Sequence, residues 1–160
     1  MAKGFSVPDT KEVSRMLTFL LGRDVRVGKG NRIRTGNRDR WTLGVYITES
    51  NEIVGVCATD LPMASHFGAA LSLFPPHKSK KCIAEGVLED GIWENTLEVF
   101  NVVSRYFHDA ADGMIQLGDS WNDGAEVPVD VKKFMRRSKR RTDLRVNING
   151  YGPGSLALIG

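Results

Sequence analysis

The stretch from Glu85 to Phe107 constrains the fold most, because its side chains repeat at the spacing of an amphipathic helix. One row of apolar and small side chains recurs three and four positions apart and comprises Leu97, Phe100, Ser104 and Phe107, with Ile92 and Trp93 before them. A second, polar row comprises Asp90, Glu94, Glu98, Asn101 and Arg105. The pattern predicts a long helix with one buried face. Gly86 and Gly91 weaken its first half, so a break or bend is expected there.

The polar row has two interpretations. Residues three and four apart are neighbours on a helix surface, where like charges such as Glu94 and Glu98 repel by roughly 0.2–0.5 kcal/mol. A cost this small is common, so a solvated face is the default interpretation for any single acid in the row. The second interpretation concerns Glu98 and Asn101 together, an acid and an amide one turn apart that project in the same direction.

The first half of the chain carries clear start and stop signals. Asp9 and Glu12 have the spacing of a capping box ahead of an apolar stripe, and Gly22 ends that stripe. Asp60 caps a later helix that has Pro62 in its first turn. The expected elements are a helix at 13–21, a strand at 24–27, a mobile loop or irregular hairpin at 28–40, a β-hairpin with strands at 41–48 and 52–59, a helix between 60 and 75, and a basic link at 77–81.

The pattern of the second half of the chain predicts fewer helices than that of the first half. After the turn at Asp112–Gly113, the expected elements are a short strand at 114–117, a turn-rich loop at 118–124, a short helix at 128–137, and a second hairpin with strands at 143–149 and 155–159. Antiparallel strands interrupted by helices, without regular βαβ alternation, indicate an α+β fold. We expect a mostly antiparallel sheet with the helices packed on one face.

The length and the composition of the chain fit one globular domain spanning residues 1–160. No stretch has the apolar length needed to span a bilayer, and Met1–Phe5 lacks the apolar run of a signal peptide, so a cytoplasmic protein without a membrane partner is expected. Cys57 and Cys82 form no CxxC pattern and are expected to be buried free thiols. The histidines, His66, His77 and His108, show no metal-ligand spacing, so no metal or other cofactor is expected in this chain.

The net charge of +3 is unevenly placed, with basic residues concentrated at 23–40 and 132–141. Clustered Arg and Lys attract polyanions, so phosphate or nucleic-acid contact is one interpretation of each segment. Solvated basic surface is the default interpretation. Nucleic acid is disfavoured as a partner of the first segment, because aromatic side chains that could stack on bases are missing before Trp41.

The order of elements and one motif resemble the CheC/CheX/FliY-type phosphatases of bacterial chemotaxis, and CheX most of all. The resemblance spans most of the chain as a pattern. It includes the opening helix that ends in Leu-Leu-Gly and the hairpin and helix from Leu43 to Leu73. Its motif is a long helix carrying an acid-x-x-x-Glu-x-x-Asn sequence, here Glu94, Glu98 and Asn101, with the small Ser104 one turn on.

The resemblance implies that this helix inserts into the active site of a phosphorylated response regulator. Asn101 would orient the attacking water, and Glu98 would pair with the active-site lysine of the regulator. Glu94 and Arg105, on the same row, would contact the partner. Any divalent metal would be carried by the regulator.

Two alternatives remain. Flagellar switch proteins with family-like folds have no phosphatase activity, so the chain could be a non-catalytic interaction or adaptor domain of the same fold. The second alternative is a polyanion or nucleotide binder that uses Arg136, Arg137, Arg140 and Arg141. Exposed strand edges would also allow a homodimer to form.

Overall fold

The computed structural model describes residues 7–107 and 114–160. Met1–Phe5, His108 and the turn expected at Asp112–Gly113 therefore lie outside the described residues. The helices are α1 (Thr10–Leu21), α2 (Leu61–Leu71), α3 (Pro76–Glu85), α4 (Asp90–Ser104), the 3₁₀ helix η1 (Gly124–Glu126) and α5 (Val129–Arg137). The strands are β1 (Val25–Lys29), β2 (Trp41–Ile47), β3 (Ile53–Asp60), β4 (Gln116–Trp121), β5 (Arg141–Ile148) and β6 (Gly152–Ile159).

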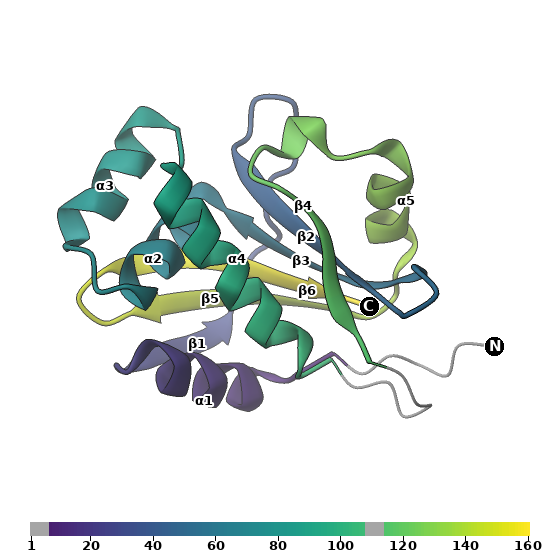
Figure 1. The fold of residues 1–160 in the computed structure, drawn as a ribbon, viewed down its shortest axis with the longest axis horizontal. Helices are drawn as coiled ribbons and strands as arrows, with labels where there is room; N and C mark the ends of the chain where they lie inside the picture. Colours follow the sequence, from purple (N-terminus) through teal and green to yellow (C-terminus); the bar gives the residue numbers. More distant parts are fainter. Residues whose placement is uncertain (1–6, 108–113) are drawn as a thin grey trace.

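The six strands form one antiparallel sheet in the order β1-β5-β6-β3-β2-β4. Both predicted hairpins are present: Trp41 of β2 is opposite Asp60 of β3, and Arg141 of β5 is opposite Ile159 of β6. The last strand of the chain lies in the middle of the sheet, between β5 and β3 (Figure 1). The α+β class and the mostly antiparallel sheet expected from the sequence are confirmed.

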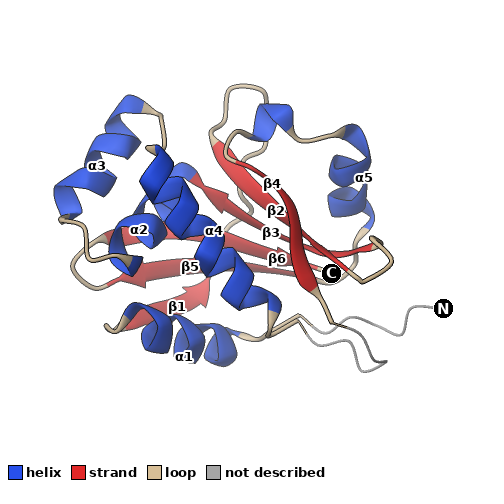
Figure 2. Cartoon of the chain, in the orientation of Figure 1, coloured by secondary structure: helices blue, strands red, loops and turns tan. Residues whose placement is uncertain are grey.

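The sheet has a core on each face, as the alternation along β6 illustrates. Leu156 and Leu158 belong to the larger core, which also contains buried side chains of α1, α2 and α4. Ala157 and Ile159 point the other way, into a second core that α5 covers with Val131. Figure 2 shows α1, α2 and α4 gathered together, with α5 set apart from them. Helix α5 is thus the exception to the expectation that the helices lie on one face.

Two helix starts follow from local chemistry. The Asp9 carboxylate accepts a hydrogen bond from the Glu12 backbone N–H (2.9 Å), and the Glu12 side chain accepts one from the Asp9 N–H (3.3 Å), which completes the predicted capping box. The Asp60 carboxylate caps α2 through Met63 N–H (2.9 Å) and also accepts from Ser155 N–H (3.1 Å). The cap of α2 therefore also ties that helix to β6.

Two expectations about boundaries were wrong, and a third was wrong in part. The basic link at 77–81 is part of α3, because Ser79 and Cys82 are buried and give this polar segment a packed face. The helix expected from 85 to 107 begins only at Asp90: the break expected at Gly86 is present, because this glycine ends α3 in the left-handed conformation (φ 70°), but Gly91 lies within α4 without breaking it. The loop expected at 118–124 is half strand, because β4 continues to Trp121 along β2.

Candidate functional site

Hydrogen bonds between helices fix the rotation of α4 about its axis. The buried Thr96 hydroxyl lies 2.7 Å from the Ala64 carbonyl oxygen of α2 and 2.9 Å from that of Ile92. One turn of α2 further on, the Asn95 amide donates to the Gly68 carbonyl oxygen (2.9 Å) and the Ser72 hydroxyl (2.8 Å). These bonds hold α4 against α2 along one line, so the opposite side of α4 is directed outward.

A second attachment holds the C-terminal half of α4 to the sheet. The buried Tyr46 hydroxyl of β2 donates to the Phe100 carbonyl oxygen (2.8 Å). The Tyr46 ring lies 4.7 Å from the Phe107 ring, and the Phe100 ring meets Trp93 edge-on at 6.1 Å. Burial, followed by the charge of Cys57, raises the pKa of Tyr46 well above its ordinary value, so this hydroxyl stays a donor.

The outward side of α4 carries all four residues that the sequence singled out. Glu94, Glu98 and Arg105 are exposed, and Asn101 is half-buried. Within the described part of the chain, neither the Asn101 amide nor the Glu98 carboxylate forms a hydrogen bond or an ion pair. Both groups are therefore available to a partner, and the helix that presents them is held in place on its other side.

Asn101 also borders a surface hollow of about 400 Å³ between the end of α4 and the start of β4. The Ser104 hydroxyl donates to the Asn101 carbonyl oxygen (2.5 Å), so this small residue turns its polar atom back onto the helix. The hollow is lined by Asn101, Ser104, Arg105, Phe107, Met114, Ile115 and Gln116. Its position leaves room beside the Asn101 amide for a group brought by another molecule.

Sequence reasoning found the polar row but misplaced part of the buried one. Leu97 and Trp93 are only half-buried, whereas Thr96, Val99 and Val103 belong to the fully buried face. The roles of Thr96 and Asn95 were missed, because polar side chains on a helix are ordinarily expected to face solvent. Their (i, i+3) and (i, i+4) spacing from Val99 was the available signal.

One further expectation is confirmed. Cys57 and Cys82 are buried free thiols, as predicted. Over residues 7–107 and 114–160, no group of three or more His, Cys, Asp or Glu side chains is placed to hold a metal ion. Over the same residues, no helix is both long and apolar enough to cross a membrane.

Comparisons with known proteins give structural likeness only. No protein-family model matches the sequence, and no curated protein matches it. The FliM middle domain from H. pylori superposes with a TM-score of 0.60 at 9% identity, covering 94% of this chain and 83% of that one. The CheX–CheY–BeF₃–Mg²⁺ complex from Borrelia burgdorferi gives a TM-score of 0.51 at 13% identity, with coverages of 94% and 97%. FliY from Thermotoga maritima gives 0.50 at 10% identity, with coverages of 91% and 80%.

This chain has the fold of CheX, FliY and the FliM middle domain. The resemblance read from the sequence is confirmed at that level. Its preference for CheX is not, because the FliM middle domain superposes with a higher TM-score than the CheX complex.

Proposed function

We propose that this protein hydrolyses the aspartyl phosphate of a response regulator, with Asn101 and Glu98 as the working pair. The observation that carries the proposal is the outward face of α4, where neither side chain has a partner among residues 7–107 and 114–160, on a helix held by Thr96 and Tyr46. The CheX structure with the same fold is a complex with CheY, BeF₃ and Mg²⁺. A phosphorylated regulator is therefore the partner class that we infer.

The chemistry asks for positioning more than for a strong base. The water oxygen forms a bond to phosphorus, the bond from phosphorus to the aspartyl oxygen breaks, and the water proton passes to a phosphate oxygen. The products are a free carboxylate and inorganic phosphate. Such a reaction depends on a water held in line with the breaking bond. The Asn101 amide can donate to and accept from that water without adding negative charge beside the phosphoryl group.

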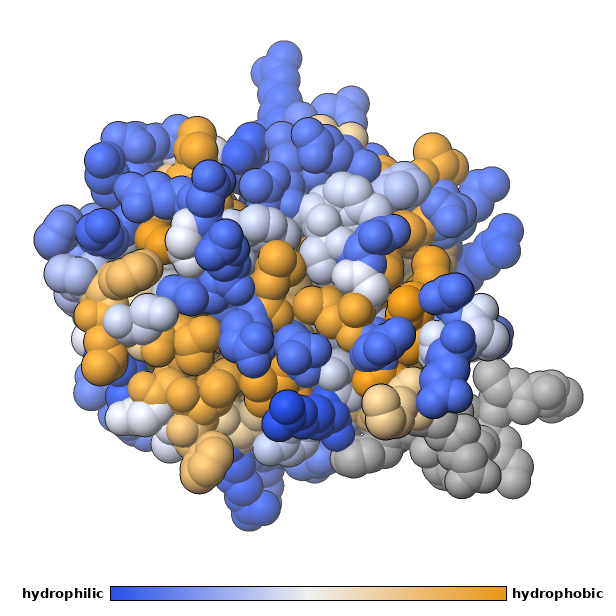
Figure 3. All heavy atoms as spheres, in the orientation of Figure 1, coloured by the Kyte–Doolittle hydropathy of each residue, from blue (hydrophilic) through white to orange (hydrophobic). Residues whose placement is uncertain are grey.

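Glu98 suits a different task. A carboxylate beside the phosphoryl group would repel it, but one turn earlier on α4 the Glu98 carboxylate can reach a cation of the partner. Hydrogen bonds to charged groups contribute roughly 1.5–3 kcal/mol. Glu94 and Arg105 extend the same exposed line and would contact the regulator around this pair. Figure 3 shows hydrophobic surface on both sides of hydrophilic side chains that follow α4, a mixture that suits a protein partner.

The test is the loss of phosphate from receiver domains of the same organism, measured with the wild type and with Asn101→Ala, Asn101→Asp and Glu98→Ala. We expect wild type to accelerate the loss. Asn101→Ala should reduce the acceleration on the order of 100-fold, since the water is no longer held. Asn101→Asp should fail as well, because its charge repels the phosphoryl group. Glu98→Ala should act mainly through weaker binding, by about tenfold or more.

Glu85→Ala, exposed at the end of α3, is the matched control and should behave as wild type. Thermal melts establish that each variant is folded. Undiminished acceleration by a folded Asn101→Ala variant would contradict the assigned role of the amide.

A non-catalytic interaction domain is the second candidate. It is favoured by the higher TM-score of the FliM middle domain and by the exposed apolar side chains Phe19 (92% exposed) and Leu73 (70%). The same assay separates the two candidates. A regulator that binds with equal affinity with and without phosphate, and whose phosphate decays no faster, would support the interaction domain.

A further inference from the structure

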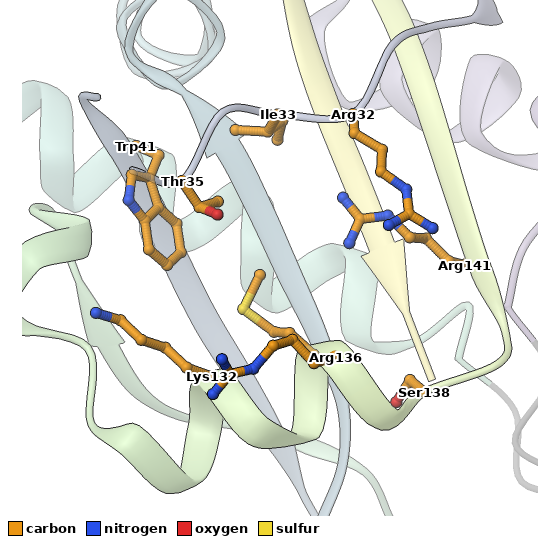
Figure 4. A pocket seen from close by; sticks show the side chains of 9 residues that line it. Arg32, Ile33, Thr35, Trp41, Lys132, Arg136, Ser138 and Arg141 are labelled. Atoms are coloured by element: carbon orange, nitrogen blue, oxygen red, sulfur yellow. The ribbon is translucent and has the colours of Figure 1, made fainter. Parts of the chain in front are cut away.

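Two basic segments that are far apart in the sequence meet at one cavity. The cavity has a volume of about 340 Å³ and lies between the connection from β1 to β2, helix α5 and the start of β5. In Figure 4, Arg32 and Arg141 lie together on one side of the cavity, and Lys132 and Arg136 lie on the α5 side. Its lining comprises Arg32, Ile33, Thr35, Trp41, Lys132, Met135, Arg136, Ser138 and Arg141.

The charge at this cavity is unbalanced. Among the described residues that line it, four are cationic and none is acidic. Arg141 has a carboxylate partner, Asp143, whose Oδ2 accepts from Nε at 2.9 Å. Within residues 7–107 and 114–160, Arg32, Lys132 and Arg136 form no ion pair. Like charges held around one hollow repel one another, and an anion placed among them removes that repulsion.

The connection that carries Arg32 is anchored to the sheet. Ile33 is buried in the same core as Trp41 and Val131, and the Gly30 N–H donates to the Asp143 carbonyl oxygen (3.0 Å). The sequence indicated a solvated loop here. Ile33 is a single apolar residue among many polar ones, so the sequence gave little indication that it anchors this connection to the sheet. Arg32 is therefore held close to α5 by neighbours on both sides.

The remaining lining suits a small molecule. Trp41, only 2% exposed, and Ile33 form an apolar floor, while the Thr35 and Ser138 hydroxyls add neutral donors. A concave site with an apolar floor and a few converging polar groups is typical of small-ligand binding. The alternative explanation is that basic residues favour the C-terminal end of α5, which accounts for Arg136 but not for Arg32 on another segment.

We propose that this cavity binds a phosphate-bearing small molecule with at least two negative charges, such as a di- or triphosphate. Arg32, Lys132 and Arg136 bind the phosphate oxygens, and Arg141 is positioned by Asp143. The site is on the sheet face that α5 covers, opposite the face on which α4 packs, so it is independent of the proposed phosphatase pair.

The test is calorimetric titration of the full chain at low salt with inorganic pyrophosphate, inorganic phosphate and ATP as separate probes. The double variant Arg32→Gln/Arg136→Gln removes two cavity cations. Its control, Arg34→Gln/Arg137→Gln, removes the same charge from the same two segments, at exposed residues outside the lining. We expect pyrophosphate to bind more tightly than phosphate. The cavity variant should weaken pyrophosphate binding by about tenfold or more, and the control by less than about twofold.

The ATP arm tells a nucleotide from a simple polyphosphate, because an added base either strengthens binding at this site or leaves it unchanged. A single-stranded oligonucleotide is titrated in the same way, so that its binding can be compared with that of the small molecules. Equal losses in both double variants would mean that diffuse surface charge, not the cavity, binds anions, and would overturn the proposal. Absence of heat with pyrophosphate and ATP alike would also overturn it. The Asn101→Ala variant should bind pyrophosphate as wild type does, so failure here is distinguishable from failure of the phosphatase proposal.

Discussion

Replacing Gly68 by alanine should destabilise the protein, although alanine is the better helix former. Gly68 lies where α2 crosses α4. A Cβ built there would be 2.1 Å from the Ile92 carbonyl oxygen and 2.5 Å from the Ile92 Cγ2. Ordinary contact begins at 3.4 Å, so the two helices would have to separate by roughly 1 Å or more.

The cost follows from what that separation disrupts. Overpacking of a well-packed core costs about 1–3 kcal/mol. The same movement lengthens the bonds from Asn95 to the Gly68 carbonyl oxygen (2.9 Å) and from Thr96 to that of Ala64 (2.7 Å). Each lost bond adds about 1 kcal/mol. We expect a decrease of about 3–5 kcal/mol in the free energy of unfolding, a large part of the 5–15 kcal/mol typical of a domain.

Urea denaturation followed by circular dichroism measures this change. The matched control is Gly91→Ala, because a Cβ at this α4 position meets no atom of the described residues within 4 Å. Removing that glycine should stabilise the protein by up to about 0.5–1 kcal/mol. The opposite signs of the two substitutions are the test. A Gly68→Ala variant as stable as wild type would refute the close crossing of α2 and α4.

Two further predictions concern buried polar groups. Burial, followed by the charge of Lys80, lowers the pKa of His66 from 6.5 to about 4, so below pH 6.5 the unfolded chain binds a proton more readily than the folded chain does. The free energy of unfolding should therefore fall by up to about 2 kcal/mol between pH 7.5 and pH 5. Urea melts at the two pH values should show a smaller fall for His66→Gln than for wild type. Tyr46→Phe removes the hydroxyl that donates to the Phe100 carbonyl oxygen, and it should lower the free energy of unfolding by about 1–3 kcal/mol in the same melts. No decrease would mean that α4 does not depend on this hydrogen bond.

The features that could be predicted from the residues alone are those that depend on neighbours along the chain. The capping box of Asp9 and Glu12, the cap at Asp60 and both hairpins use residues close in sequence, so their signals are legible without the fold. The row from Glu94 to Arg105 was legible for the same reason, because helical spacing alone puts these side chains on one line. Glu98 and Asn101 were found in this way.

How these elements face one another depends instead on contacts between residues that are far apart in the chain. The spacing of Thr96 and Asn95 from Val99 is a local signal for the inward side of α4, but no local pattern encodes the α2 carbonyl oxygens that accept from their side chains. Helix α5 covers the second face of the sheet because both faces of β6 are apolar. The sequence pattern of β6 alone did not show which face a given helix would cover. Arg32 and Arg136 share one cavity because buried Ile33 fixes the connection against the sheet, and such long-range packing depends on the whole core.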